Sequence, residues 1–316
     1  WLFSVNPDMD VATYAFKNGF KSACKNGHLN VAQWLFSENQ DIDISADSEY
    51  AFKSACWNGH LDVLKWLISV QSDVIDTCAE YAFERACERG RLNIVKWLLD
   101  MDISYKHCWN KAFLNACGRG HLDVAKLLFT VNPDIDIDNT FNRACVCGHL
   151  YLAKWLLRIN PNVYNFQSVF IYTCKYGYLF LAKWLLLEIS ARNKYAPIND
   201  AFINSCESGQ LKVAKWLLTV KPDIDILPPS TTNDEDDGKY KTPFYRACMN
   251  GYIEVMEWLI SINPDVVDIS AYNVSDFLWA CENGHLKVAK WLLTVKPDIA
   301  ISADDERCKL ISIPFM

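Results

Sequence analysis

The sequence predicts an all-α repeat solenoid, and three observations support this fold class. A cysteine recurs along the chain with a phenylalanine four residues before it and a glycine three residues after it. A tryptophan follows that glycine by seven residues in eight of nine copies. The spacing from phenylalanine to tryptophan is constant at 14 residues, whereas the linker to the next copy varies. A rigid unit with variable connections is the signature of stacked repeats.

Nine copies of this unit cover most of the 316 residues. They are centred on Cys24, Cys56, Cys87, Cys117, Cys145, Cys174, Cys206, Cys248 and Cys281, and Leu127 replaces the tryptophan of the fourth copy. We therefore predict nine full helix pairs in a single domain over residues 1–316, with partial units at both ends.

Each copy contains two apolar patterns with helical spacing. The phenylalanine and the cysteine lie four residues apart and share one helix face, which predicts a short first helix that ends at the glycine. Apolar residues then follow at the spacing of a second amphipathic helix, as in Leu61, Val63, Leu64 and Leu67. Prolines such as Pro133 end that helix in several copies. Each copy is thus predicted as helix, turn, helix and a short hairpin-like connecting loop.

One copy, residues 54–68, reads Ser-Ala-Cys-Trp-Asn-Gly-His-Leu-Asp-Val-Leu-Lys-Trp-Leu-Ile, and another begins with Thr242-Pro243-Phe244-Tyr245. These segments resemble the ankyrin-repeat family, whose repeats carry A-A-x-x-G-H-x-x-V-V-x-L-L-L and start with T-P-L-H. The resemblance implies an ankyrin-repeat array without a cofactor. The variant with Ala-Cys, Gly-His-Leu and Ala-Lys-Trp-Leu-Leu is similar to ankyrin arrays of giant viruses of amoebae or of their hosts.

The sequence departs from the family pattern in two places. The usual Gly-Ala-Asp after the second helix is replaced by Asn-Pro-Asp or Lys-Pro-Asp, and the Thr-Pro start survives in one copy. We therefore expect side chains of Asp, Ser, Thr and Asn to cap the other first helices. We also expect some connecting arms to differ in shape from those of the family.

The repetition argues against a catalytic or metal site. The repeat cysteines are predicted to be buried and structural, since a catalytic thiol would be singular. Histidine follows the repeat glycine in five copies, but Arg91, Tyr178, Gln210 and Tyr252 replace it in the others, which a metal site would not tolerate. The recurrent tryptophans could stack on bases or cage a ligand, but a core role is favoured because every copy needs an anchor. We predict no enzyme activity and no catalytic, cofactor-binding or metal-binding residues.

The charge balance bears on the partner. A net charge of -7 and a pI near 5.4 weigh against nucleic-acid binding and favour a basic or neutral protein partner. A lysine precedes the tryptophan position in seven copies. This row could follow a phosphate backbone, but a solvated outer face is favoured because Asp62 and Asp123 partly neutralise it.

Composition also bears on location. Nine of the 13 cysteines occupy one repeated internal position, as reduced structural cysteines do, which predicts a reducing compartment. The chain has no apolar stretch of about 20 residues, so we predict no membrane association. We expect an intracellular, cytoplasmic monomer, in the host cytoplasm if the protein is viral. Because Trp1 matches the end of a repeat, we also expect the natural chain to extend further.

The two residues between the repeat cysteine and the glycine differ in every copy. In ankyrin proteins, which this chain resembles, this pair faces the concave groove and contacts the partner together with the loop tips. The resemblance therefore implies partner-binding candidates, which are Lys25, Trp57, Glu88, Arg89, Arg119, Val146, Lys175, Tyr176, Glu207, Met249 and Glu282. We predict a non-catalytic protein-binding scaffold. The alternative is the substrate-recognition subunit of a ubiquitin ligase whose box lies outside this chain.

The longest connector contains an acidic insertion at residues 227–241. Its composition is typical of a solvated loop. The second interpretation is an acidic finger that meets a basic patch on the partner.

Overall fold

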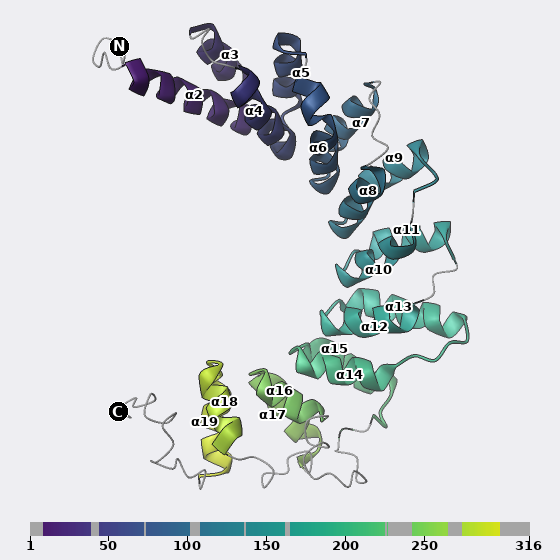
Figure 1. Ribbon diagram of the computed structural model, residues 1–316. Helices are drawn as coiled ribbons and strands as arrows, with labels where there is room; N and C mark the ends of the chain where they lie inside the picture. Colours follow the sequence, from purple (N-terminus) through teal and green to yellow (C-terminus); the bar gives the residue numbers. More distant parts are fainter. Residues whose placement is uncertain are drawn as a thin grey trace. The chain divides into compact units, whose positions relative to one another are not determined.

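The computed structural model describes residues 9–38, 44–72, 74–101, 108–135, 137–161, 165–224, 226, 242–264 and 274–297. Within these ranges the chain forms eighteen α-helices, α2 to α19, and no strand (Figure 1). None of them combines the length and the apolar character needed to cross a membrane. The predicted all-α repeat fold is confirmed. The chain divides into two compact units, Trp1–Val163 and Tyr164–Met316, which we call unit 1 and unit 2.

The described part of unit 1 contains five helix pairs. They are α2 (Met9–Asn26) with α3 (Leu29–Glu38), α4 (Ile44–Asn58) with α5 (Leu61–Val70), α6 (Val74–Glu88) with α7 (Leu92–Leu99), α8 (Trp109–Gly118) with α9 (Leu122–Val131), and α10 (Asp138–Val146) with α11 (Leu150–Ile159). The first helices pack on one another in chain order, and each second helix packs on the first helix of its own pair.

The described part of unit 2 contains four pairs with the same packing. They are α12 (Phe166–Lys175) with α13 (Leu179–Ala191), α14 (Ile198–Glu207) with α15 (Leu211–Val220), α16 (Pro243–Met249) with α17 (Ile253–Ile262), and α18 (Val274–Glu282) with α19 (Leu286–Val295). The acidic insertion 227–241 and the predicted partial units at both ends lie outside the described residues.

The phenylalanine of each repeat lies in the core, as predicted, and so does the cysteine of every repeat except the last, where Cys281 is half-buried. Phe52, Phe83 and Phe113 are fully buried, and so are Cys56 and Cys87 one helical turn further along. Burial of a phenylalanine side chain contributes about 1.5–3 kcal/mol. These residues hold consecutive first helices together, which positions the exposed side of each helix relative to the next.

A glycine turn joins the two helices of every pair. All nine repeat glycines have positive φ, from 67° at Gly90 to 98° at Gly59. The amide after the glycine donates back to the carbonyl five residues earlier, as from His60 N to Ala55 O at 3.0 Å. This is the Schellman helix end, which glycine favours because it has no Cβ. The turn fixes the direction of the two variable residues that precede it.

The prediction of short first helices is wrong for three pairs. Helices α2, α4 and α6 contain 18, 15 and 15 residues. In contrast, α16 has seven residues and starts at Thr242-Pro243. Proline at the first position disfavours a helical conformation for the residue before it, so the helix cannot extend backwards. Where the Thr-Pro start is lost, this restriction is lost as well.

The prediction that polar side chains cap the first helices is wrong for α8, α10, α12 and α14. The residues before these helices are Cys108, Ile137, Asn165 and Pro197, and none of their side chains makes a capping hydrogen bond. Only Thr242 caps in this way among the described first-helix starts, accepting from Tyr245 N at 3.1 Å. Packing between repeats, more than capping, stabilises the other starts.

The tryptophans are less buried than a core position implies. Trp34 is 55% exposed, which contradicts its predicted core role, and the other repeat tryptophans are half-buried. Five of the rings meet the phenylalanine of the preceding repeat, whereas Trp34 meets Phe16 of its own helix pair. The centroid distances are 6.1 Å for Phe20–Trp66, 6.4 Å for Phe113–Trp155, 6.4 Å for Phe170–Trp216, 6.1 Å for Phe202–Trp258 and 5.6 Å for Phe244–Trp291. One side of the ring packs while the other stays open to solvent.

Candidate functional site

The predicted partner-binding residues of unit 1 lie at the C-terminal ends of its first helices. Trp57 lies in the last turn of α4 and Glu88 ends α6, while Arg89 and Arg119 directly follow α6 and α8. The structure brings these four side chains together. Lys25 and Val146 occupy the equivalent ends of α2 and α10.

Arg89 stacks on Trp57 across two consecutive repeats. The guanidinium carbon of Arg89 lies 3.6 Å from the centroid of the Trp57 ring, and that of Arg85 lies 5.9 Å from it. An arginine over the face of a tryptophan gains a cation–π interaction and loses rotational freedom. Trp57 thereby holds the guanidinium plane of Arg89 in one orientation at the surface.

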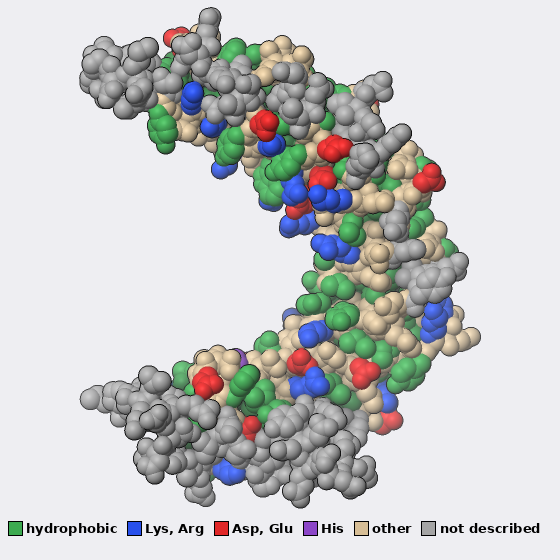
Figure 2. Space-filling view, in the orientation of Figure 1, with side chains coloured by type: hydrophobic (Ala, Val, Ile, Leu, Met, Phe, Trp, Pro, Cys, Tyr) green, Lys and Arg blue, Asp and Glu red, His purple; other side chains and the backbone are tan. Residues whose placement is uncertain are grey.

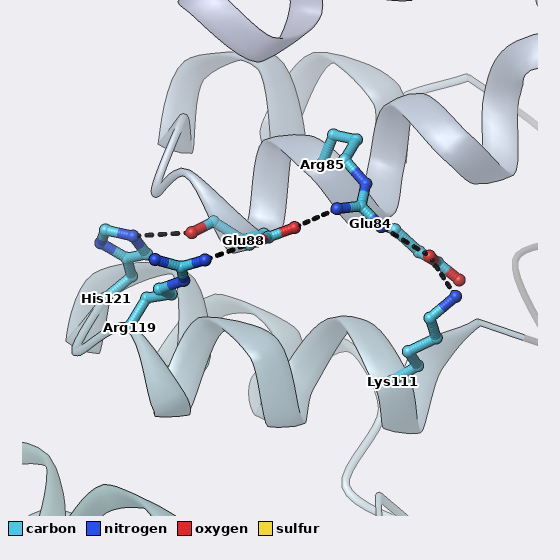
Figure 3. A network of polar contacts seen from close by, with 6 residues as sticks. All are labelled: Glu84, Arg85, Glu88, Lys111, Arg119 and His121. Atoms are coloured by element: carbon cyan, nitrogen blue, oxygen red, sulfur yellow. Dashed lines mark hydrogen bonds and ion pairs between the residues drawn. The ribbon is translucent and has the colours of Figure 1, made fainter. Parts of the chain in front are cut away.

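A network of ion pairs continues from α6 to α8 (Figure 3). Glu88 pairs with Arg85 in its own helix and accepts from Arg119 Nη2 at 3.0 Å, while Glu84 lies 2.7 Å from Lys111 Nζ. The Glu88 side chain is only 11% exposed, whereas that of Arg119 is 60% exposed. Glu88 therefore holds the two arginines in place, and the guanidinium of Arg119 faces outward while the Arg85 side chain is 25% exposed.

In three copies the residue after the repeat glycine forms a hydrogen bond to the preceding repeat. Nε2 of His121 and of His149 lies 3.0 Å from the carbonyl oxygens of Glu88 and Gly118, and since a carbonyl only accepts, these nitrogens donate. Arg91 Nε makes the equivalent bond to Trp57 O at 3.3 Å. Burial lowers the pKa of His121, which favours the neutral ring. This position supports the stacking of repeats.

Further residues on the same helix faces were not among the predicted contacts. Lys53 Nζ lies 5.3 Å from the Tyr81 ring, the Arg85 guanidinium lies at the same distance from that ring, and Lys21 Nζ lies 5.8 Å from the Tyr50 ring. These residues stand three, four or seven positions before the variable pairs. This spacing in the sequence could have identified them, because residues three, four or seven positions apart share one face of a helix.

In unit 2 the predicted residues also lie at first-helix ends. Lys175 ends α12 and Tyr176 follows it, while Glu207, Met249 and Glu282 end α14, α16 and α18. Glu207 lies between two cations, with Lys175 Nζ at 3.6 Å and Arg246 in direct contact. The Met249 carbonyl accepts from Trp279 Nε1 at 3.1 Å. Tyr176 is 49% exposed.

The repeat cysteines are poor nucleophiles. Burial raises the pKa of the Cys24 and Cys56 thiols to about 12, and it raises the pKa of Cys87 and Cys117 well above the ordinary value. Cys56 Sγ donates to Ala82 O of the next repeat at 3.0 Å. Because the thiolate is the reactive form, these groups pack without reacting.

Comparison with known families agrees with this architecture. A family model of three ankyrin repeats matches residues 52–141, 83–165 and 225–305, and a model of many ankyrin repeats matches residues 8–68. No curated protein matches the chain. Ankyrin repeats are generally protein–protein interaction modules and are typically non-catalytic. Together the matched ranges cover well over half of the sequence, and the chain belongs to the ankyrin-repeat family.

Proposed function

We propose that this protein is a non-catalytic scaffold that binds a partner protein through the C-terminal ends of its first helices. One observation carries the proposal. The turn that follows these ends has the same backbone form in all nine described repeats, while the two residues before it change from repeat to repeat. A constant frame that presents variable, solvent-accessible side chains is what recognition of a protein surface requires.

The eleven residues predicted from the sequence are the proposed contacts, and the connecting loops complete them. We propose that the nine pairs form one ankyrin-repeat domain over residues 1–316, with these residues lining its concave groove, and that the protein acts as a cytoplasmic monomer. In the alternative, a substrate-recognition subunit of a ubiquitin ligase, the same surface would hold the substrate. An origin in giant viruses of amoebae or in their hosts stays a prediction.

Affinity capture with matched variants tests the proposal. One variant combines Trp57→Ala, Arg89→Glu and Arg119→Glu in unit 1, and a second combines Lys175→Glu, Tyr176→Ala and Met249→Ala in unit 2. The control variant, Lys65→Glu with Lys96→Glu and Lys126→Glu, changes exposed lysines of the second helices. Circular dichroism checks that all three variants fold.

We expect at least one of the first-helix variants to lose a partner that the wild type and the control variant both capture. Interface hot spots, which are enriched in Trp, Tyr and Arg, cost about 2 kcal/mol or more each when they are truncated, so a variant that removes two or three of them should lose binding. If every folded variant captures the same proteins as the wild type, the proposed surface is wrong.

A further inference from the structure

The first helices of unit 1 are less acidic than the chain as a whole. In the sequence, these five helices and the residue that follows each contain nine Lys or Arg and eight Asp or Glu, and the acidic residues whose side chains the structure describes are four Glu. The corresponding part of unit 2 has two cations, Lys175 and Arg246, and four acidic residues. The complete chain has a net charge of -7. Figure 2 shows Lys and Arg side chains along the side of unit 1 that these helices form.

Two acidic residues of this surface, Glu84 and Glu88, are largely covered, whereas Glu49 and Glu80 are exposed. The side chains of Glu84 and Glu88 are 12% and 11% exposed. Those of their partners Lys111 and Arg119 are 62% and 60% exposed. Each of these carboxylates lies between two cations, Glu88 between Arg85 and Arg119 and Glu84 between Arg85 and Lys111 (Figure 3). The field that a ligand meets at this surface is therefore positive.

Among the cations of this surface, Arg89 is held in the orientation that best suits ligand binding. Its guanidinium stacks on Trp57, and no carboxylate among the described residues lies within ion-pair distance of it. A stacked guanidinium keeps its N–H edge available for a bidentate carboxylate, and little side-chain entropy is lost on binding. Tyr50 and Tyr81, which are 50% and 42% exposed, add apolar area beside the cations.

We infer that this surface, the basic–aromatic strip formed by Tyr50, Trp57, Tyr81, Arg89, Lys111 and Arg119, binds an acidic segment of the partner protein. The inference rests on the proposed function and specifies the chemistry of one part of its surface. Arg89 and Arg119 occupy the same position in consecutive repeats, and packed helices lie about 8–10 Å apart. A peptide in the polyproline II conformation has three residues per turn and advances about 3.1 Å per residue, so acidic side chains three residues apart lie on one face at a spacing that matches the two arginines.

The charge distribution favours an acidic peptide over a nucleic acid. Among the described first-helix side chains, cations outnumber acidic residues in unit 1 but not in unit 2, and the chain as a whole is acidic. A long polyanion would extend beyond the strip and meet the net negative charge of the rest of the chain. A short acidic segment would contact the strip alone.

Fluorescence anisotropy on the full chain tests the inference. The probe is a labelled peptide of about twelve residues with Glu at every third position and Ser between, because one three-residue turn of the polyproline II conformation spans the expected repeat spacing. A matched peptide has Gln in place of Glu, and a single-stranded DNA oligonucleotide of equal charge is the third ligand. We expect the Glu peptide to bind about tenfold or more tighter than the Gln peptide, with an affinity that falls as salt rises.

Variants locate the binding. Arg89→Ala and Arg119→Ala should each weaken the Glu peptide about tenfold. Arg89→Lys should fall between wild type and Arg89→Ala, because lysine keeps the charge and loses the planar fork. Arg158→Ala is the matched control, since this exposed arginine lies on the second helix α11 of the same unit. It should bind the peptide like the wild type.

Three results would overturn the inference: equal affinity for the Glu and Gln peptides, equal losses in Arg158→Ala and Arg89→Ala, or tighter binding of the DNA than of the Glu peptide. The capture experiment separates this inference from the proposed function. If the unit 1 variant loses its captured partner while the Glu peptide does not bind, the scaffold proposal stands and the acidic ligand is wrong.

Discussion

At the scale of single residues, the repeat glycine meets two demands at once. Its backbone has a left-handed conformation. In addition, the residue that follows the glycine of the next repeat places its side chain where a Cβ on this glycine would project. A Cβ on Gly90 would collide with the ring of His121, and one on Gly251 would collide with the ring of His285. Arg91 stands in the same place beside Gly59. The position after the glycine thus tolerates several side chains of sufficient size, which accounts for its variation.

Gly251→Ala and Gly284→Ala separate the two demands. Both glycines have positive φ, 81° and 73°, but a Cβ on Gly284 would meet nothing within 4 Å. Gly284→Ala should lower the free energy of unfolding by about 1–2 kcal/mol from backbone strain alone. Gly251→Ala should lower it by roughly 1–3 kcal/mol more, because the His285 ring must move.

Urea denaturation followed by circular dichroism measures both losses. If the two variants were equally destabilised, the collision with His285 would contribute nothing, and the second demand would be excluded.

At the scale of helices, the way each first helix begins sets its length. Thr242 accepts from Tyr245 N and Pro243 occupies the first turn, so α16 has a defined start. The starts of α8, α10, α12 and α14 have no side-chain cap, and burial of their apolar residues in the repeat stack replaces it. Local capping and packing thus act as alternative ways to stabilise the same element.

Thr242→Ala should therefore destabilise the protein by about 1 kcal/mol, because the amide of Tyr245 loses its partner in a buried position. Thr294→Ala in α19 is the control. That hydroxyl is exposed and donates to Lys290 O within its own helix, so its loss should change the free energy of unfolding by less than about 0.5 kcal/mol. The melting temperatures of the two variants are compared by thermal unfolding. Similar decreases in both would argue against the stabilising role of the Thr242 cap.

At the scale of the whole molecule, the cysteines report on the packing of every repeat. Ten of the twelve cysteines in the described ranges are buried, and Cys147 and Cys281 are half-buried. Burial raises the pKa of the thiols of Cys24, Cys56 and Cys108 to about 12. Both access and thiolate formation are therefore restricted across the two units.

We expect an alkylating reagent at mildly alkaline pH to modify Cys147 and Cys281 before the buried cysteines. Mass spectrometry of peptides from the native protein measures the order, and the same reaction in denaturant provides the reference in which all thiols react. Rapid labelling of Cys56 or Cys87 in the native protein would contradict the packing described for their repeats.

The repeat itself was readable from the sequence. Phe52, Cys56, Gly59 and Leu67 follow helix periodicity and turn chemistry, which depend on neighbours within a few residues and are confirmed by nine copies. Helix starts were predicted less well, since Cys108 and Pro197 carry no capping signal and only packing explains why helices begin after them. The sequence identified which two positions vary between repeats, but it did not show the contacts that their side chains make.

The tertiary structure decided those contacts. Arg89 reaches Trp57 and Arg119 reaches Glu88 across consecutive repeats, and Trp66 packs on Phe20 of the repeat before. The net charge of -7 favours a basic or neutral partner, but it is a sum and does not show where the individual charges lie on the surface. Stacking gathers cations of unit 1 on one surface and covers Glu84 and Glu88 beneath them. Local periodicity therefore determined the fold of each repeat, whereas the character of the proposed binding surface arises only where side chains of neighbouring repeats meet.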